Sequence, residues 1–210
     1  MYLGGLCFIT DRTIQGLSYE DMTHRVLMKG LRWIQFREKE RTRHEIYREA
    51  VMLRGLTRDY NAVLIINDFL DIAMCVDADG VHLGQDDLPL REARKIVGRH
   101  RIIGISTRNI EQAVEAEKNG ADYIGFGPVF PTRTKNAGKP KGLDLLRHVK
   151  KQVKIPVVAI GSISLENISS VLQTGVDAVA VASAILRGNI EENAQRFMNH
   201  LKTGDERSTF

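Results

Sequence analysis

Cysteine is scarce in this sequence, and its placement argues against two classes of small stapled protein. The chain has two cysteines, Cys7 and Cys75, which lie far apart and form neither a CxxC pair nor a Cys/His cluster. A disulfide framework or a zinc site would need such spacing. We therefore expect a chain that folds around its own hydrophobic core in a reducing, cytoplasmic compartment.

Long apolar runs are also missing from the sequence. No stretch approaches the roughly 18 to 20 apolar residues of a membrane-spanning helix, so we expect no membrane association. The apolar start, MYLGGLCFIT, is short, has no basic leader and continues directly into Asp11. It predicts a first β-strand rather than a signal peptide.

A strong excess of one charge is missing too. The 30 Lys and Arg against 26 Asp and Glu leave a formal net charge of +4 and a sequence pI of about 9.1. This mild excess is compatible with anionic substrates or with nucleic acid. Many basic residues lie in 41–58, where Glu45 and Glu49 are interleaved with them. That mixture is typical of a solvated helix face, so we expect no nucleic-acid partner.

The chain lacks the GxGxxG turn that usually follows the first strand of an open, doubly wound sheet. Short apolar runs instead alternate with longer amphipathic segments, and runs such as VLII and AVAVAS are typical of strands in a parallel sheet. The predicted strands are Leu6–Thr10, Trp33–Arg37, Val63–Asn67, Gly80–Leu83, Arg101–Ser106, Tyr123–Gly127, Pro156–Gly161 and Ala178–Ser183. The predicted helices are Tyr19–Leu27, Arg43–Thr57, Asp68–Cys75, Leu90–Val97, Ile110–Lys118, Leu143–Lys151, Leu165–Gln173 and Glu191–Leu201.

About eight β–α units predict an α/β fold, namely a single, compact (β/α)8 TIM barrel over residues 1–202. The polar tail, 203–210, is expected to be frayed. A weak repeat supports the barrel, because DADGVHLG, GADYIGFG and GVDAVAVAS each place an aspartate at the start of an even-numbered strand. We expect Gly120 and Gly175 to end helices in a left-handed conformation. Chance recurrence of common residues is the alternative.

In such a barrel, functional side chains gather where strands end and β–α loops begin. The second strand ends in IQFREKE, where Gln35, Arg37 and Lys39 are spaced by two and would share one face. An amide and two cations at the barrel mouth suit a polar, anionic ligand. Solvated charges that pair with Glu38 or Glu40 are the alternative.

Acidic residues follow the third and fourth strands. Asn67 and Asp68 end the third strand, and Asp68 suits either a helix cap or a ligand site. In GVHLGQDDLP, Asp86 and Asp87 suit a helix dipole or, for one of them together with Asp68, a Mg²⁺ ion. His82 in the same motif fits a hydrogen-bonded core histidine as well as a catalytic group.

The later strands add groups that can bind anions. The fifth strand ends in GIST with Ser106, and the sixth leads into GFGPVFPTRTK, where Lys135 can neutralise a phosphate and Thr132 and Thr134 can donate hydroxyl groups. The segment 136–142, NAGKPKG, predicts a mobile flap. AIGSIS and AVASAI precede helices whose N–H groups would bind a phosphate. Two anionic groups indicate one bisphosphorylated substrate or two substrates.

Eight motifs together resemble the thiamine-phosphate synthase family. They are ITD, IQFREKE, INDFLDIA, ADGVHLGQDDLP, GIST, GADYIGFGPVFPTRTK, PVVAIG and VAVASAI, in this order along nearly the whole chain. The resemblance implies a barrel that transfers a hydroxymethylpyrimidine group from its pyrophosphate to the nitrogen of hydroxyethylthiazole phosphate. It also implies a dissociative route through a pyrimidine carbocation, with thiamine phosphate and pyrophosphate as products.

The resemblance further implies a role for each matching residue. Gln35 is similar to a glutamine that contacts the pyrimidine, and Ser106 to a serine near the pyrimidine amine. Asp68 and Asp87 are similar to the Mg²⁺ ligands. The pyrophosphate ligands would be Arg37, Lys39, Asn67 and Lys135. The groups near the thiazole phosphate would be Thr132, Thr134, Ser162, Ala182 and Ser183. Arg37, Lys39, Ser106 and Lys135 would act in catalysis.

Two positions depart from the family pattern. Gly161 is followed by Ser162 where the family usually has a second glycine, so thiazole-phosphate affinity depends on whether serine adopts the backbone shape needed there. Arg108 stands where relatives often carry a histidine, which argues against a thiazole tautomerase. Such an isomerase and a non-catalytic precursor-binding protein are the alternative hypotheses. A homodimer is compatible with the sequence, which does not determine the oligomeric state.

Overall fold

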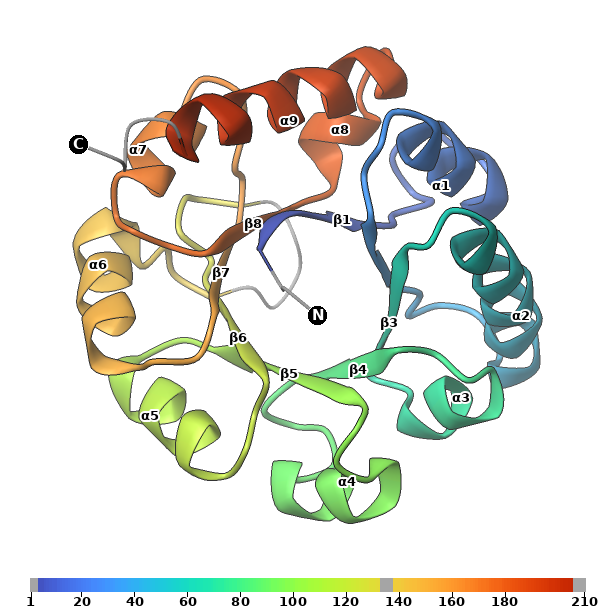
Figure 1. Ribbon diagram of the computed structural model, residues 1–210, viewed down its shortest axis with the longest axis horizontal. Helices are drawn as coiled ribbons and strands as arrows, with labels where there is room; N and C mark the ends of the chain where they lie inside the picture. The colour runs from blue at the N-terminus through green and yellow to red at the C-terminus, as the bar shows by residue number, and fades with distance from the viewer. Residues whose placement is uncertain (1–3, 133–137, 206–210) are drawn as a thin grey trace.

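The computed structural model describes residues 4–132 and 138–205, and it contains a closed barrel of eight parallel strands in the order β1 to β8 (Figure 1). The strands are β1 (Gly5–Ile9), β2 (Trp33–Phe36), β3 (Val63–Asn67), β4 (Gly80–Leu83), β5 (Ile102–Thr107), β6 (Tyr123–Phe126), β7 (Val157–Ile160) and β8 (Ala178–Val181). The helices are α1 (Tyr19–Met28), α2 (Arg43–Asp59), α3 (Leu70–Cys75), α4 (Leu90–Val97), α5 (Ile110–Lys118), α6 (Gly142–Gln152), α7 (Ile168–Leu172), α8 (Ser183–Leu186) and α9 (Ile190–Asp205).

The predicted TIM barrel is confirmed, and each predicted strand forms within two residues of its expected ends. Three local predictions differ from the structure. Helix α7 begins at Ile168 rather than Leu165, and the short helix α8 follows β8 where no separate helix was predicted. Helix α9 continues to Asp205, three residues beyond the expected domain boundary, and 206–210 lie outside the described residues.

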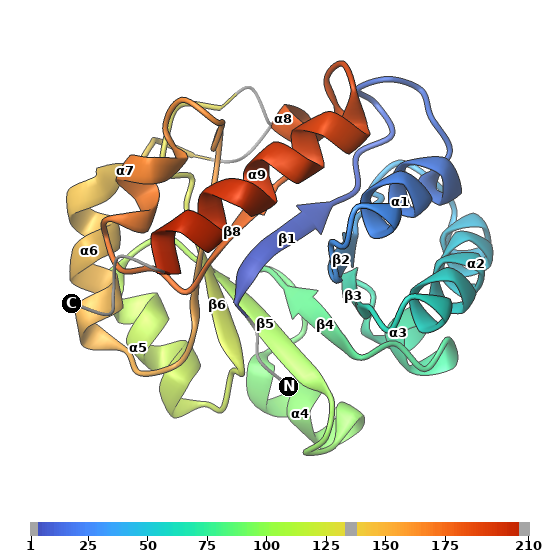
Figure 2. The same cartoon turned by 45° about the horizontal axis from the view of Figure 1, so that its top comes forward.

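The last helix covers the seam where the two ends of the chain meet. Strand β8 pairs in parallel with β1, from Gly5 opposite Ala178 to Phe8 opposite Val181. Figure 2 shows α9 lying along the outside of this seam, and it contacts α1, α7, α8 and β1. The barrel is therefore closed by packing between the first and last units of the sequence.

Two hydrophobic clusters fill the molecule. The larger one lies between the strands and the helices, and the smaller one consists of alternate strand residues inside the barrel, including Cys7, Trp33, Ile65 and Tyr123. Burial raises the pKa of the Cys7 thiol, which keeps it neutral. Gly104 makes room for the Tyr123 ring, because a Cβ there would lie 2.1 Å from the Tyr123 side chain. Packing thus places an apolar layer directly beneath the carboxyl ends of the strands.

The repeated aspartates fasten the amino ends of the strands. Asp79, Asp122 and Asp177 precede β4, β6 and β8, and each accepts one backbone N–H from the preceding odd-numbered strand at 2.7 Å. Each also pairs at 2.6 Å with a basic residue, namely Arg54, Arg94 and Lys150 in that order.

The expected left-handed glycines lie two positions before Asp122 and Asp177. Gly120 and Gly175 have φ values of 87° and 85°, which confirms that expectation. A fourth copy of the pattern was missed before β2. There Gly30, also at positive φ, is followed by Leu31 and then by Arg32 in place of the aspartate. This copy could not be recognised from the sequence because Arg32 replaces the aspartate that marks the other copies.

Candidate functional site

Four polar side chains form a layer just above the apolar interior of the barrel. Gln35, Asn67, His82 and Ser106 come from β2, β3, β4 and β5, in register positions that point inward. Gln35, Asn67 and His82 are only 4%, 7% and 7% exposed. Buried polar groups of this kind must find hydrogen-bond partners, either within the protein or in a ligand.

His82 links this layer to Tyr123. Its Nδ1 lies 2.9 Å from the Tyr123 hydroxyl and its Nε2 lies 2.9 Å from Ser106 Oγ. Burial lowers the pKa of His82 to about 4, and the more distant Asp87 carboxylate acts weakly in the opposite direction. The imidazole is therefore neutral near pH 7. Of the two hypotheses for this residue, the hydrogen-bonded core histidine describes its contacts.

The cations that follow β2 do not continue its alternation. The strand ends at Phe36, so the expectation that Gln35, Arg37 and Lys39 share one strand face is wrong beyond Gln35. The Arg37 N–H donates to Thr10 Oγ1 at 3.0 Å, outside the strand ladder. Arg37 and Lys39 consequently lie in a loop whose shape other residues determine.

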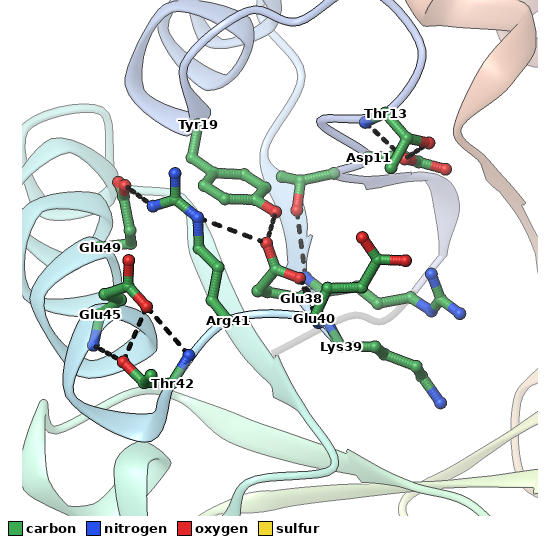
Figure 3. Close-up of polar contacts among 12 residues, drawn as sticks. Asp11, Thr13, Tyr19, Glu38, Lys39, Glu40, Arg41, Thr42, Glu45 and Glu49 are labelled. Carbon is green, nitrogen blue, oxygen red and sulfur yellow. Dashed lines mark hydrogen bonds and ion pairs between the residues drawn. The ribbon is translucent and has the colours of Figure 1, made fainter.

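Glu38 determines the shape of that loop (Figure 3). Its carboxylate accepts the N–H groups of Lys39 and Glu40 at 2.6 and 2.7 Å and the Tyr19 hydroxyl at 2.7 Å. Burial alone would raise the pKa of Glu38, but these hydrogen bonds outweigh it and lower the pKa below its usual value. Arg41 connects the loop to α2. Its Nε lies 3.8 Å from Glu38 Oε2, and its Nη1 lies 2.9 Å from Glu49 Oε1.

Helix α2 begins immediately after this loop. Thr42 and Glu45 form a capping box, in which the Thr42 hydroxyl accepts the Glu45 N–H and the Glu45 side chain accepts the Thr42 N–H (Figure 3). From the sequence, Glu38 was expected only as a possible partner of the neighbouring cations. Its structural role was missed because Tyr19 approaches it from a separate β–α unit.

Asp68, Asp87 and Lys39 lie together at the ends of β2, β3 and β4. Lys39 Nζ lies 3.1 Å from Asp68 Oδ2, and Asp87 Oδ2 accepts the Gly84 N–H at 2.6 Å. Burial raises the pKa of Asp87, and the adjacent Asp68 carboxylate raises it further, against the opposing effects of the Gly84 N–H and Lys39. Two crowded carboxylates of this kind favour a bound cation.

Neither aspartate caps a helix with its side chain. Helix α3 begins at Leu70 with Phe69 at the cap position, and α4 begins at Leu90 with Pro89 at the cap position. Asp68 has a left-handed backbone, with φ of 66°, and its N–H donates to the His82 carbonyl. The helix-cap hypothesis for Asp68 is therefore wrong. Asp86, beside Asp87, is exposed.

The ends of β6, β7 and β8 carry the remaining predicted site residues. Thr132 is half-buried, whereas Thr134 and Lys135 lie outside the described residues. Ser162 is exposed and has φ of 49°, in the left-handed region. Ala182 precedes α8 and Ser183 is its first residue. Of β7 and β8, β8 therefore leads directly into a helix, whereas α7 starts six residues after Ser162, contrary to expectation.

The predicted flap, 136–142, is described only from residue 138 onward. The N–H groups of Lys141 and Gly142 donate to the carbonyls of Pro128 and Val129 at 2.8 and 3.0 Å. This end of the segment is thus attached to the chain that leaves β6. Motion of the segment stays a prediction.

The described part of the chain has neither a three-residue metal cluster nor a membrane-spanning helix. Within 4–132 and 138–205, no three His, Cys, Asp or Glu residues come together as a ready-made metal cage. Over the same part of the chain, no helix has the length and apolar character needed to cross a membrane.

Comparisons with known proteins agree with this arrangement. Residues 6–185 match the family model described as thiamine monophosphate synthase. The thiamine-phosphate synthase of Alkaliphilus oremlandii is 43% identical over 94% of this chain and 96% of its own. That of Methanospirillum hungatei is 48% identical over 87% and 89%.

Solved structures give the same result. The thiamine phosphate pyrophosphorylase of Pyrococcus furiosus superimposes with a TM-score of 0.89, at 40% identity over 95% of this chain and 96% of that one. A 3-hexulose-6-phosphate synthase, at 14% identity and a TM-score of 0.73, shares the fold alone. From the matching family model, the relatives above 40% identity and the common barrel, we conclude that this chain belongs to the thiamine-phosphate synthase family.

Proposed function

We propose that this chain joins hydroxymethylpyrimidine pyrophosphate and hydroxyethylthiazole phosphate to give thiamine phosphate and pyrophosphate, at the carboxyl end of the barrel. The observation that carries this proposal is the cluster of Lys39, Asp68 and Asp87 beside the buried polar layer. A cation and two crowded carboxylates suit a metal-bound pyrophosphate, and the polar layer suits a heteroaromatic ring.

The reaction would begin with loss of the pyrophosphate from the pyrimidine methylene group. The bonding electrons leave with the pyrophosphate oxygen, so negative charge accumulates there as the bond breaks. Arg37 and Lys39 belong to the loop shaped by Glu38, and their cationic side chains would stabilise that charge. The thiazole nitrogen then donates its electron pair to the methylene carbon. No nucleophilic side chain is needed.

A magnesium ion fits the acid pair. Asp68 and Asp87 would hold it, and two carboxylates suffice because Mg²⁺ keeps several waters and binds phosphate oxygens. The raised pKa of Asp87 supports this assignment, since a cation would relieve the repulsion between the carboxylates. When bound, the ion would stabilise charge on the leaving pyrophosphate oxygens.

The remaining groups would bind and orient the two substrates. Gln35 and Ser106 suit the polar edge of the pyrimidine ring, and Asn67 suits a pyrophosphate oxygen. Thr132 and Thr134 would serve the thiazole phosphate, together with Ser162, Ala182 and Ser183. Lys135 would add a further cation for the pyrophosphate. A cytoplasmic location, a homodimer and the absence of a nucleic-acid partner also stay predictions.

The test is a direct assay of purified protein with both substrates, with and without Mg²⁺. We expect thiamine phosphate and pyrophosphate in equal amounts, with product formation abolished by removal of the metal. Binding of the pyrimidine pyrophosphate without any product would instead favour a precursor-binding protein. Conversion of a thiazole phosphate isomer in the absence of the pyrimidine would favour an isomerase.

A further inference from the structure

Three side chains from three strands form one hydrogen-bonded chain inside the barrel. Tyr123 on β6 bonds to His82 on β4, and His82 bonds to Ser106 on β5. We call this chain the interior relay. Tyr123 and His82 lie in the barrel interior, and Ser106 is one of the residues that the proposed function places against the pyrimidine ring.

The interior relay is enclosed by packing. Tyr123 is 1% exposed and His82 is 7% exposed. The indole of Trp33 meets the Tyr123 ring edge-on at 5.3 Å between centroids. Gly125 admits the imidazole, because a Cβ there would lie 3.1 Å from His82 Cε1. These contacts keep the Tyr123 and His82 side chains close to each other.

The protons of the relay have one consistent direction. Burial raises the pKa of the Tyr123 phenol, so the phenol keeps its own proton. A buried hydroxyl must place its hydrogen on an acceptor, and His82 Nδ1 lies 2.9 Å from the Tyr123 oxygen to accept it. A neutral imidazole that accepts at Nδ1 carries its proton at Nε2. His82 Nε2–H therefore donates to Ser106 Oγ, which leaves the serine hydrogen to be donated elsewhere.

We propose that the interior relay holds Ser106 as a hydrogen-bond donor toward the substrate ring, and so selects an aminopyrimidine over its oxo analogue. This inference rests on the proposed function. In an aminopyrimidine, the ring nitrogen beside the amine is an acceptor, which matches a serine donor. In the oxo analogue, that nitrogen carries a hydrogen and the exocyclic group is an acceptor, so the pattern is reversed. Tyr123 and His82 would be positioning residues that never touch the substrate.

The first test is a measurement on the wild-type protein. The ¹⁵N shifts of the His82 ring report which nitrogen carries the proton, and the resonances can be assigned by their loss in a His82→Gln variant. We expect the Nε2–H tautomer in the wild-type protein. An Nδ1–H tautomer would overturn the proposal, because the relay would then run in the opposite direction.

The second test uses Tyr123→Phe, which removes the phenol donor without altering the ring. His82 could then adopt either tautomer, so Ser106 could donate or accept. We expect wild-type kcat/KM to favour the aminopyrimidine pyrophosphate over its oxo analogue by about 100-fold or more, since a site built for one hydrogen-bond pattern rejects the reverse. We expect Tyr123→Phe to reduce that preference at least about tenfold, with mixed His82 tautomers. An unchanged preference would overturn the proposal.

The control is Tyr60→Phe. Tyr60 also places its hydroxyl 3.0 Å from a histidine nitrogen, His24 Nε2, but on the outside of the barrel between α1 and α2. The same chemical change there should leave the substrate preference within twofold of wild type. Failure of the proposed function would look different, because wild-type protein would then form no thiamine phosphate from the aminopyrimidine, whatever the His82 tautomer.

Discussion

At the amino end of the barrel, Asp79, Asp122 and Asp177 each accept a backbone N–H and pair with a basic side chain. At the carboxyl end, Asp68 and Asp87 are neighbouring carboxylates, and Lys39 Nζ lies 3.1 Å from Asp68 Oδ2. The first arrangement satisfies each charge within the protein. The second leaves two carboxylates incompletely compensated, which costs stability but prepares a site for a cation.

The backbone shows a weaker contrast. At the amino end, Gly120 and Gly175 are left-handed where helices end, and Asn61 and Asp77 are left-handed as well. At the carboxyl end, Asp68 and Ser162 are left-handed non-glycine residues at predicted ligand positions. Two of the strained non-glycine residues thus coincide with proposed binding positions. Changes at the two ends should separate stability from activity.

The largest expected effect is on activity, in Asp87→Asn. Loss of one carboxylate from the acid pair should lower kcat by about 100-fold or more. The free energy of unfolding should stay the same or rise slightly, because the raised pKa of Asp87 shows that its charge is disfavoured in the fold. Steady-state kinetics and urea unfolding measure the two effects. Asp86→Asn, which removes an exposed neighbouring charge, is the matched control, and equal kcat in both variants would refute the metal assignment.

Acid should destabilise the protein through His82. Its pKa falls from about 6.5 to about 4 on burial, so the unfolded chain binds more protons between these values. Stability should therefore be complete above pH 6.5 and should be lost as the pH falls toward 4, by on the order of 3 kcal/mol. Urea unfolding at stepped pH measures this loss. A His82→Asn variant should show a shallower slope, and an equal slope would assign the loss to other groups.

Asp79→Ala should affect stability and leave activity alone. It removes the acceptor of the Leu64 N–H and the partner of Arg54, whose Nε already lacks a hydrogen bond among the described residues. Leaving these groups unpaired should cost about 2 kcal/mol of unfolding free energy, with kcat within twofold of wild type.

The control for this change is Asp71→Ala. Asp71 and Arg43 also form an ion pair, but both side chains are more than half exposed. Exposed pairs contribute little, so the expected loss is below about 0.5 kcal/mol. Equal losses in Asp79→Ala and Asp71→Ala would mean that the strand-start aspartates are ordinary surface charges.

The smallest expected effect is that of Ser162→Gly. Ser162 already adopts φ of 49°, so glycine should relieve about 1 kcal/mol of strain at most, offset by greater freedom in the unfolded chain. The KM for the thiazole phosphate should change by less than threefold, because the backbone shape is present with serine. A large fall in KM would show that the Ser162 side chain itself obstructs the site.

The fold could be predicted almost completely from local pattern. Runs such as VLII and AVAVAS predicted buried parallel strands, and the aspartates before β4, β6 and β8 marked where those strands begin. The errors occur where sequence signals were short. Helix α8 has four residues, and α7 starts late because Asn167 Oδ1 accepts the Ser164 N–H in a turn before it.

The predicted site residues were easier to find than to position. Asp68 and Asp87 were recognised from residue type and place in the chain, but their contact with Lys39 depends on three separate β–α units meeting at one end of the barrel. The role of Glu38 was missed because its partner, Tyr19, lies 19 residues earlier on α1. Long-range contacts of this kind leave no local periodicity to detect.

The sequence by itself determined the strand and helix order, the polar ends of the strands and the resemblance to a family, since all three depend on residue type and near-neighbour spacing. The tertiary structure alone decided that Arg37 and Lys39 lie in a loop shaped by Glu38, that Asp68 faces a lysine instead of capping a helix, and that Tyr123 bonds to His82, which bonds to Ser106, in the interior relay. Those arrangements arise from barrel closure, which brings distant strands into register and encloses polar groups that then need hydrogen-bond partners in the protein or in a ligand.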